Sequence, residues 1–288
     1  MSWSPSEGSR VRTPGLVWPD TSIAPPPAWV EAVVTLRPGT HPGKVELASG
    51  GTWFYPTDAK GPLAVPAIQP APSTTVQVVA VGDELVAFHD AAGWASNPKS
   101  LVPAFIEARR QATPGRLLWA PGLGAPEDYA LWTYLGVDLF DASPLLLAAV
   151  RGKALTTDGP VDAAAAARTL GDGSANDSKI WGEAELLAHN LEAARRELEK
   201  IRLAIETGTL RALVERRAAS KPASVELLRR FDREHGHLEA ATPRHRTATL
   251  PAMTVDAIWS PEVESFRRRL RGPYAPPPAP ILVLLPCS

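Results

Sequence analysis

The chain has 288 residues, of which 44% are apolar and 21% are charged. This balance is typical of a globular protein with a hydrophobic core and excludes a chain that is disordered throughout. The formal net charge of -1 excludes a polycation, and the single cysteine, Cys287, excludes a disulfide framework. There is no apolar run of roughly 18 residues and no apolar segment of a signal peptide at the start, so we expect a cytoplasmic protein.

Charge is distributed unevenly along the chain. Acidic residues outnumber basic ones up to Ala194, whereas basic residues outnumber acidic ones from Arg195 to Arg271. The basic part includes the consecutive arginines Arg267, Arg268 and Arg269. This asymmetry predicts a basic face hidden behind a near-neutral total, with nucleic acid as one partner. The alternative is that these arginines lie on solvated helix faces.

The first 72 residues are rich in proline, glycine and serine, and we expect only short strands there, within residues 29–36, 44–47 and 52–55. Residues 74–81 and 84–88 are predicted to be two strands joined by a tight turn. Asn97 followed by Pro98 predicts the start of a helix that ends near residue 112.

Residues 116–140 predict a pair of parallel strands. An apolar strand at 116–120 is followed by a glycine-containing loop at 121–125, a helix from Pro126 to Leu135, a cap at Gly136 and a second strand at 137–140. A helix placed between two strands makes the strands parallel. The alternation therefore predicts an α/β layer or barrel and argues against a β-sandwich.

Apolar residues at helical spacing predict a long helix over residues 183–213, interrupted at Gly208. A further helix is expected at about 224–235. After a proline-rich connector, the sequence ends in an apolar strand at 281–285. Because such a strand needs burial on both faces, we expect the sequence to be a fragment or a shortened member of a longer family.

Asp141 is the main catalytic candidate that spacing indicates. It follows the second parallel strand, at the carboxyl edge where α/β sheets and barrels place their active groups. Asp138 falls on the opposite face and is expected to be a structural hydrogen-bond acceptor. The alternative for Asp141 is an ordinary turn residue.

The loop with Gly122, Leu123 and Gly124 either brings N–H groups to a ligand or is an ordinary strand–helix turn.

The histidines give weaker signals. His189 lies off the apolar stripe of the long helix, where it is either a ligand or a surface residue. His235 and His237 would point in different directions on a helix. We therefore expect no metal site from these two residues and the nearby His245.

Three segments resemble a known family. Residues 117–159, which contain GVDLFD, and residues 186–208, which contain HN, are similar to the tRNA-guanine transglycosylase superfamily. Residues 260–288, which end in LLPCS, resemble its archaeosine synthase branch. The resemblance extends over roughly Thr75 to Ser288.

The resemblance implies a (β/α)8-type barrel that acts on a 7-deazaguanine base in nucleic acid. It assigns to Asp141 the attack on the ribose carbon, and to Gly122, Leu123 and Gly124 contact with the base. Such a role suits a carboxylate because it can share the positive charge of an oxocarbenium-like sugar. Cys287 corresponds to the region on which the chemistry of archaeosine synthase depends, and it is the second catalytic candidate.

Two features depart from the family pattern. His189 matches a zinc ligand of the family, but no cysteine lies between Asp158 and Trp181, where the other three ligands belong. A lone histidine does not make a structural zinc site, so we expect no metal and no other cofactor. Residues 48–51 (ASGG) lack the aspartate of the family's DSGG segment, which argues against full base exchange.

Together these inferences predict an α/β protein in three parts. Residues 1–72 form a poorly matched part of the barrel, residues 73–218 form a TIM-barrel-like transglycosylase region, complete or incomplete, and residues 219–288 form a helical linker and the start of a second α/β domain. The predicted function is the modification of a 7-deazaguanine base in tRNA by a transferase of the archaeosine synthase type, with DNA as the other possible substrate. A homodimer or a partner subunit is compatible with this function. The alternative is a non-catalytic nucleic-acid-binding or partner subunit that uses Arg267, Arg268 and Arg269.

Overall fold

The computed structural model describes residues 12–20, 27–30, 32–35, 44–46, 52–54, 78–80, 85–88, 91, 95, 97–112, 115–170, 181–234, 236, 238 and 252–272. The predictions for Cys287, for the strand at 281–285 and for His235, His237 and His245 lie outside the described residues. Within the described part, none of the helices has the length and hydrophobicity needed to cross a membrane.

A six-stranded sheet, in the order β2-β1-β8-β7-β6-β5, forms the base of the molecule. Its strands are β1 (Gly15–Asp20), β2 (Ala32–Thr35), β5 (Val78–Ala80), β6 (Leu85–Phe88), β7 (Leu117–Trp119) and β8 (Leu139–Asp141). Neighbouring strands are parallel except β5, which is antiparallel to β6. Both predicted strand pairs are therefore confirmed, and the protein is of the mixed α/β class.

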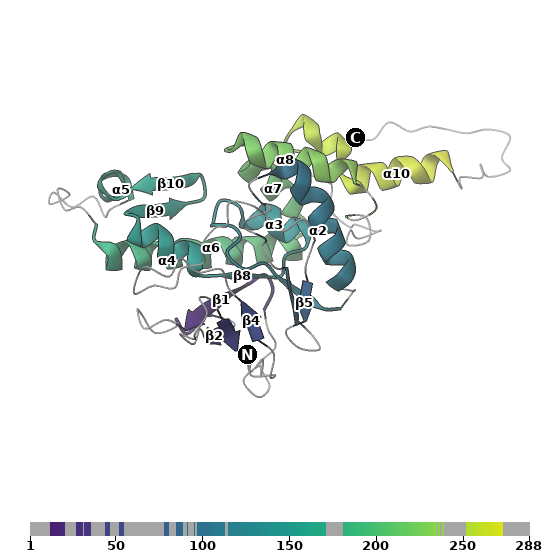
Figure 1. Ribbon diagram of the computed structural model, residues 1–288. Coiled ribbons are helices and arrows are strands. Elements are labelled where there is room, and N and C mark those ends of the chain that lie inside the picture. Colours follow the sequence, from purple (N-terminus) through teal and green to yellow (C-terminus); the bar gives the residue numbers. More distant parts are fainter. Residues whose placement is uncertain are drawn as a thin grey trace, which may run out of the picture.

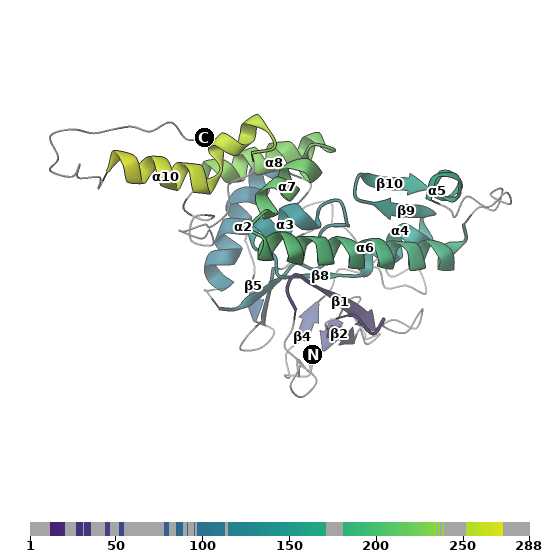
Figure 2. The same cartoon turned by 180° about the vertical axis from the view of Figure 1, so that it is seen from behind.

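The helices lie on one side of this sheet (Figure 1). They are α2 (Pro98–Ala112), α3 (Tyr129–Leu135), α4 (Ser143–Val150), α5 (Ala163–Leu170), α6 (Glu183–Glu206), α7 (Leu210–Ala218), α8 (Pro222–Arg233), the 3-10 helix η1 (Val255–Trp259) and α10 (Pro261–Arg271). Helix α5 packs on a small hairpin, and α10 extends away from the sheet (Figure 1). Seen from behind, α6 runs along this layer, with α4 and the small hairpin of β9 (Lys153–Thr156) and β10 (Gly159–Asp162) at one end and α10 at the other (Figure 2). A second hairpin pairs β3 (Lys44–Glu46) with β4 (Thr52–Phe54).

Side chains on both faces of the sheet are buried. One set packs with the helices in a continuous core and includes Leu16, Trp18, Val86, Phe88, Leu118 and Phe140. The residues that alternate with them are buried as well and include Val17, Leu85, Ala87, Trp119, Leu139 and Asp141. Because successive side chains of a strand point to opposite faces, these two sets define the two faces of the sheet. Burial on both faces is typical of parallel sheets in α/β proteins.

The helix ends follow the sequence signals with one exception. Asn97 accepts the backbone N–H groups of Lys99 and Ser100 at 3.1 and 3.4 Å, as expected of an N-cap. Gly208, with a φ of 67°, separates α6 from α7 as predicted. The helix expected from Pro126 begins only at Tyr129, and this boundary was wrong. The preceding residues form a turn, in which the N–H of Asp128 donates to the carbonyl of Ala125.

Candidate functional site

Asp141 is the last residue of β8, so the structure places it at the predicted carboxyl edge of a parallel strand. β8 lies between β1 and β7 in the interior of the sheet, and Val17 of β1 is the register partner of Asp141. One carboxylate oxygen accepts the backbone N–H of Gly122, and the other accepts that of Ser143 at 2.7 Å. The residue is only 2% exposed. The carboxylate thus ties the glycine loop and the start of α4 to the end of β8.

The loop that contains Gly122, Leu123 and Gly124 folds inward. Gly122 and Gly124 have φ angles of 68° and 82°, a left-handed backbone conformation that favours glycine. A Cβ atom on Gly124 would lie 3.2 Å from Cδ1 of Trp132, so the loop packs closely on α3. Leu123 is 2% exposed and belongs to the core. The structure thus brings this loop to Asp141, and the link is a backbone N–H of the loop itself.

Tyr129 is a neighbour of the site that the sequence did not indicate. Its ring stacks on that of Phe140, with the centroids 4.4 Å apart. Its hydroxyl is buried and has no hydrogen-bond partner among the described residues. Burial raises the pKa of this hydroxyl above its usual value, and the nearby charge of Asp141 raises it further. Tyr129 therefore keeps a neutral hydroxyl within the core, close enough to Asp141 to be affected by its charge.

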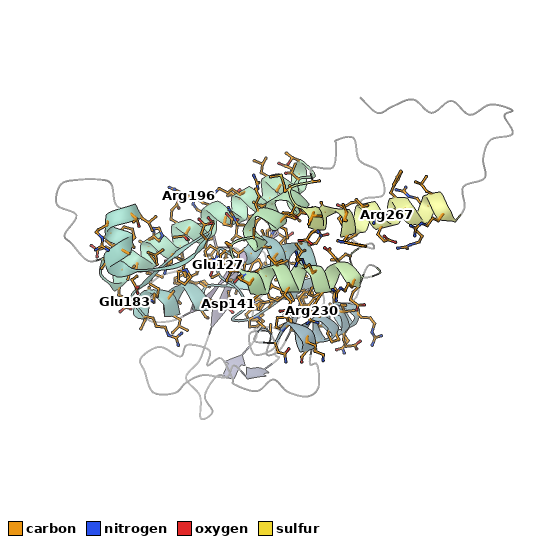
Figure 3. The ribbon with its side chains drawn as sticks, turned by 90° about the horizontal axis from the view of Figure 1, so that it is seen from above. Glu127, Asp141, Glu183, Arg196, Arg230 and Arg267 are labelled. Carbon is orange, nitrogen blue, oxygen red and sulfur yellow. The ribbon has the colours of Figure 1, made fainter. Side chains whose placement is uncertain are left out.

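The residues just before α3 are bound by a side chain from the helical layer. Lys221, which precedes α8, donates to the carboxylate of Asp128 at 2.8 and 3.0 Å and lies 3.4 Å from Oε1 of Glu127. Glu127 is 6% exposed, and its Oε2 has no hydrogen-bond partner among the described residues. Glu127 and Asp141 both lie near the middle of the molecule when it is viewed from above (Figure 3).

Asp138 has the structural role that the sequence predicted. Its Oδ2 accepts the backbone N–H of Leu118 at 2.8 Å and lies 3.2 Å from Nη1 of Arg109. Burial raises the pKa of this carboxyl, while the hydrogen bond from Leu118 and the charge of Arg109 act in the opposite direction. Asp138 therefore joins β7, β8 and α2, away from the contacts of Asp141.

His189 faces the β9–β10 hairpin and is not a free surface residue. Its Nε2 lies 3.0 Å from the carbonyl oxygen of Leu155, and its ring lies 5.1 Å from that of Trp181. Its neighbour Asn190 is completely buried. The described residues contain no group of three or more His, Cys, Asp or Glu side chains that could hold a metal ion.

The predicted arginine run lies on α10, far along the helical layer from Asp141 (Figure 3). Arg267 donates to the carbonyl of Ile258 at 3.0 Å, and its guanidinium lies 5.8 Å from the centre of the Trp259 ring. Arg268 and Arg269 are exposed. On α8, a groove of about 400 Å³ is lined by side chains that include Arg229, Arg230 and Arg233.

Comparison with known proteins shows relatives of two kinds. The chain is 32% identical over 203 residues to archaeosine synthase subunit alpha of Methanosarcina acetivorans, a match that covers 67% of this chain and 32% of that protein. It is 28% identical to archaeosine synthase of Haloferax volcanii, over 72% of this chain and 36% of the relative. It is also 27% identical to tRNA-guanine(15) transglycosylase of Thermococcus kodakarensis, over 59% of this chain and 31% of the relative. No family model matches the sequence.

The chain is related to the tRNA-guanine transglycosylase superfamily, near its archaeosine synthase branch. This finding confirms the resemblance that GVDLFD and the later HN pair indicated. The chain spans only about a third of the length of the archaeosine synthases that it matches.

Proposed function

We propose that this chain forms part of an archaeosine-synthase-like or tRNA-guanine-transglycosylase-like protein, in which it takes part in modifying a 7-deazaguanine base in tRNA. The observation that carries the proposal is the position of Asp141 at the carboxyl end of an interior parallel strand, in direct contact with the glycine loop. Such edges are where α/β sheets and barrels place catalytic groups. The names of the related proteins support the same kind of modification.

A TIM-barrel-like arrangement is part of this proposal. Among the described parallel strands, β1 and β2 come first along the chain and β8 comes last, yet β8 pairs with β1. Pairing of a late parallel strand with the first strand is what closure of a barrel requires. The division at residues 72 and 218, with a second α/β domain from residue 219 onward, remains our proposal.

In the proposed reaction, the carboxylate of Asp141 attacks the ribose carbon as the glycosidic bond to the base breaks. A carboxylate–sugar bond forms, and the departing base takes the bonding electrons; attack of a base on the same ribose carbon then breaks the carboxylate–sugar bond and frees Asp141. Because Asp141 is 2% exposed and bound to Gly122 and Ser143, the glycine loop has to move before the ribose can reach it. Gly122, Leu123 and Gly124 are then proposed to lie against the base. Cys287, outside the described residues, is proposed to act in a separate step.

The test compares Asp141→Asn with Asp138→Asn in the full-length protein. Asp141→Asn is expected to abolish the modified nucleoside, because an amide does not attack the sugar carbon. Asp138→Asn is the matched control, one residue before the same strand, and should retain modification, since Asp138 only joins structural elements. Nucleoside mass spectrometry of tRNA measures the outcome, and thermal unfolding shows that both variants are folded. Unchanged modification with Asp141→Asn would contradict the catalytic role.

A second candidate function is a non-catalytic nucleic-acid-binding or partner subunit in the same type of system. The observation that favours it is the surface of η1 and α10, where Trp259 is 52% and Phe266 is 54% exposed beside the arginine run. Exposed aromatic rings stack on unpaired bases, and arginines bind phosphates. The cytoplasm is the proposed location for either function, and a homodimer or a partner subunit is the proposed assembly.

A further inference from the structure

The HN pair of α6 reaches the β9–β10 hairpin through a set of buried and half-buried hydrogen bonds. Oδ1 of Asn190 accepts the backbone N–H of Leu155 at 2.7 Å. Its Nδ2 donates to the carbonyl of Lys153 at 3.1 Å and to that of Leu145 at 3.2 Å. The adjacent His189 contacts the carbonyl of Leu155 at 3.0 Å. Four contacts from two consecutive side chains thus join α6 to β9 and α4.

The zinc that the family resemblance implies does not fit this place. Structural zinc sites are closed sets of four nitrogen or sulfur ligands. The only cysteine of the chain is Cys287, and the stretch between Asp158 and Trp181 contains neither cysteine nor histidine. The Nε2 of His189 is engaged with the carbonyl of Leu155. In the described part of the chain, no metal-binding group of His, Cys, Asp and Glu surrounds it.

We propose that His189 and Asn190 form a hydrogen-bonded clamp. The clamp stabilises this region in place of a structural zinc ion, so that the region folds without metal. The clamp uses the polar capacity of a fully buried asparagine: its amide oxygen accepts one N–H, and its amide nitrogen donates to two carbonyls. Losing that side chain removes these three hydrogen bonds from backbone groups that are buried or half-buried, which is costly.

The clamp also bears on the candidate site. Asn190 binds the carbonyl of Leu145 in the first turns of α4, and α4 begins at Ser143, whose N–H holds the carboxylate of Asp141. Asn190 is therefore a positioning residue for the start of α4. The inference itself does not rest on the proposed function, since metal content and local stability are measured without any activity.

The first experiment measures metal. The purified chain is analysed by inductively coupled plasma mass spectrometry, and its thermal unfolding is followed with and without excess EDTA. We expect less than about 0.1 zinc per chain and the same midpoint in both conditions, because an absent metal contributes no stabilisation. Zinc near one equivalent together with a lower midpoint in EDTA would overturn the proposal.

The second experiment tests the clamp. Asn190→Ala is compared with Leu203→Ala, a matched control on the same helix whose side chain is 58% exposed. Asn190→Ala is expected to lower the unfolding midpoint by roughly 5 °C, whereas Leu203→Ala should change it by less than about 1 °C. Native-state hydrogen exchange of residues 153–162 should become at least about tenfold faster in Asn190→Ala only.

A milder variant covers the case in which Asn190→Ala does not fold. His189→Ala removes one contact to Leu155 and leaves the three bonds of Asn190, so it should fold and show a smaller acceleration of exchange in β9 and β10. If His189→Ala and Asn190→Ala both exchange like the Leu203→Ala control, the clamp does not hold the hairpin.

Discussion

Glu127 carries its carboxylate in a place with little water to solvate it. Burial raises the pKa of Glu127 above the usual 4.5, an effect that the opposing charge of Lys221 does not cancel. A carboxyl whose pKa is higher in the folded than in the unfolded state binds its proton more tightly when folded. The protonated carboxyl therefore contributes fully to stability at a pH below the pKa of the unfolded state. This contribution is lost as the pH rises through the pKa of the folded state.

The substitution Glu127→Gln should consequently stabilise the protein at neutral pH. It keeps the shape of the side chain and removes the buried charge, while Lys221 retains its bonds to Asp128. We expect the unfolding midpoint at pH 7.5 to rise by about 1–3 °C relative to the original chain, and the two midpoints to converge at about pH 4. Thermal unfolding across this pH range measures the difference. A midpoint lowered at pH 7.5 would show that the pairing with Lys221 outweighs the cost of burial.

At the scale of elements, one buried arginine joins three helices. Arg211 of α7 donates to both oxygens of Asp232 on α8, at 2.6 and 2.8 Å, and to Glu215 at 2.8 Å. Glu215 in turn accepts the backbone N–H groups of Met253 and Thr254, just before η1. Burial lowers the pKa of Arg211, but the hydrogen bonds that it donates to Asp232 and Glu215 prevail and hold its pKa above the usual value. This network fixes the position of η1, and hence of α10, on the helical layer.

Replacing Arg211 with methionine leaves two carboxylates in the interior without their cation. Arg211→Met is expected to lower the free energy of unfolding by about 3–5 kcal/mol, the usual cost of breaking a buried ion pair from one side. The control Arg196→Met removes an exposed pair with Glu192 and should cost less than about 0.5 kcal/mol. Urea denaturation followed by circular dichroism measures both values. Equal losses would mean that water reaches the network and solvates its charges.

Local sequence patterns predicted which segments form helices and strands, but they did not predict which of these elements pack against one another. Asn97, Gly136 and Gly208 signalled helix ends because a cap or a left-handed residue acts on its immediate neighbours. The start of α3 was misplaced because Asp128 bonds to Lys221, 93 residues away, and makes no side-chain cap. The β9–β10 hairpin was not predicted from the sequence, since its strands are short and α6 holds them through Asn190.

For the molecule as a whole, charge and exposed apolar surface gather at the α10 end. Of the large hydrophobic side chains exposed in the described part, Met253, Val255, Ile258, Trp259, Phe266 and Leu270 fall within residues 253–270. The same stretch carries the arginine run. Figure 3 shows Arg267 of α10 in this part of the molecule, with Arg230 of α8 nearer the middle. A total charge of only -1 thus coexists with a local surface of arginines and aromatic residues, of the kind that RNA contact requires.

Reversing two of these charges tests the surface. The variant Arg268→Glu/Arg269→Glu should weaken binding of single-stranded RNA about tenfold and make its affinity less dependent on salt, because fewer counterions are released on binding. Arg196→Glu on α6 is the control and should leave affinity within about twofold. Fluorescence anisotropy at 50 and 200 mM salt measures both. Equal affinity of the double variant and the control would show that RNA does not bind at α10.

The sequence by itself determined what depends on near neighbours: the α/β class, the parallel β7–α3–β8 unit, the place of Asp141 at a strand end, the structural role of Asp138 and the relationship to the transglycosylase superfamily. Hydrophobic periodicity, helix caps and contiguous motifs all depend on residues close together in the chain, so they can be recognised in a single sequence. The tertiary structure decided that β8 pairs with β1, that Asp141 is enclosed by backbone N–H groups, and that His189 and Asn190 bind a hairpin. These features join residues that are distant along the chain, and burial rather than local sequence determines their chemistry.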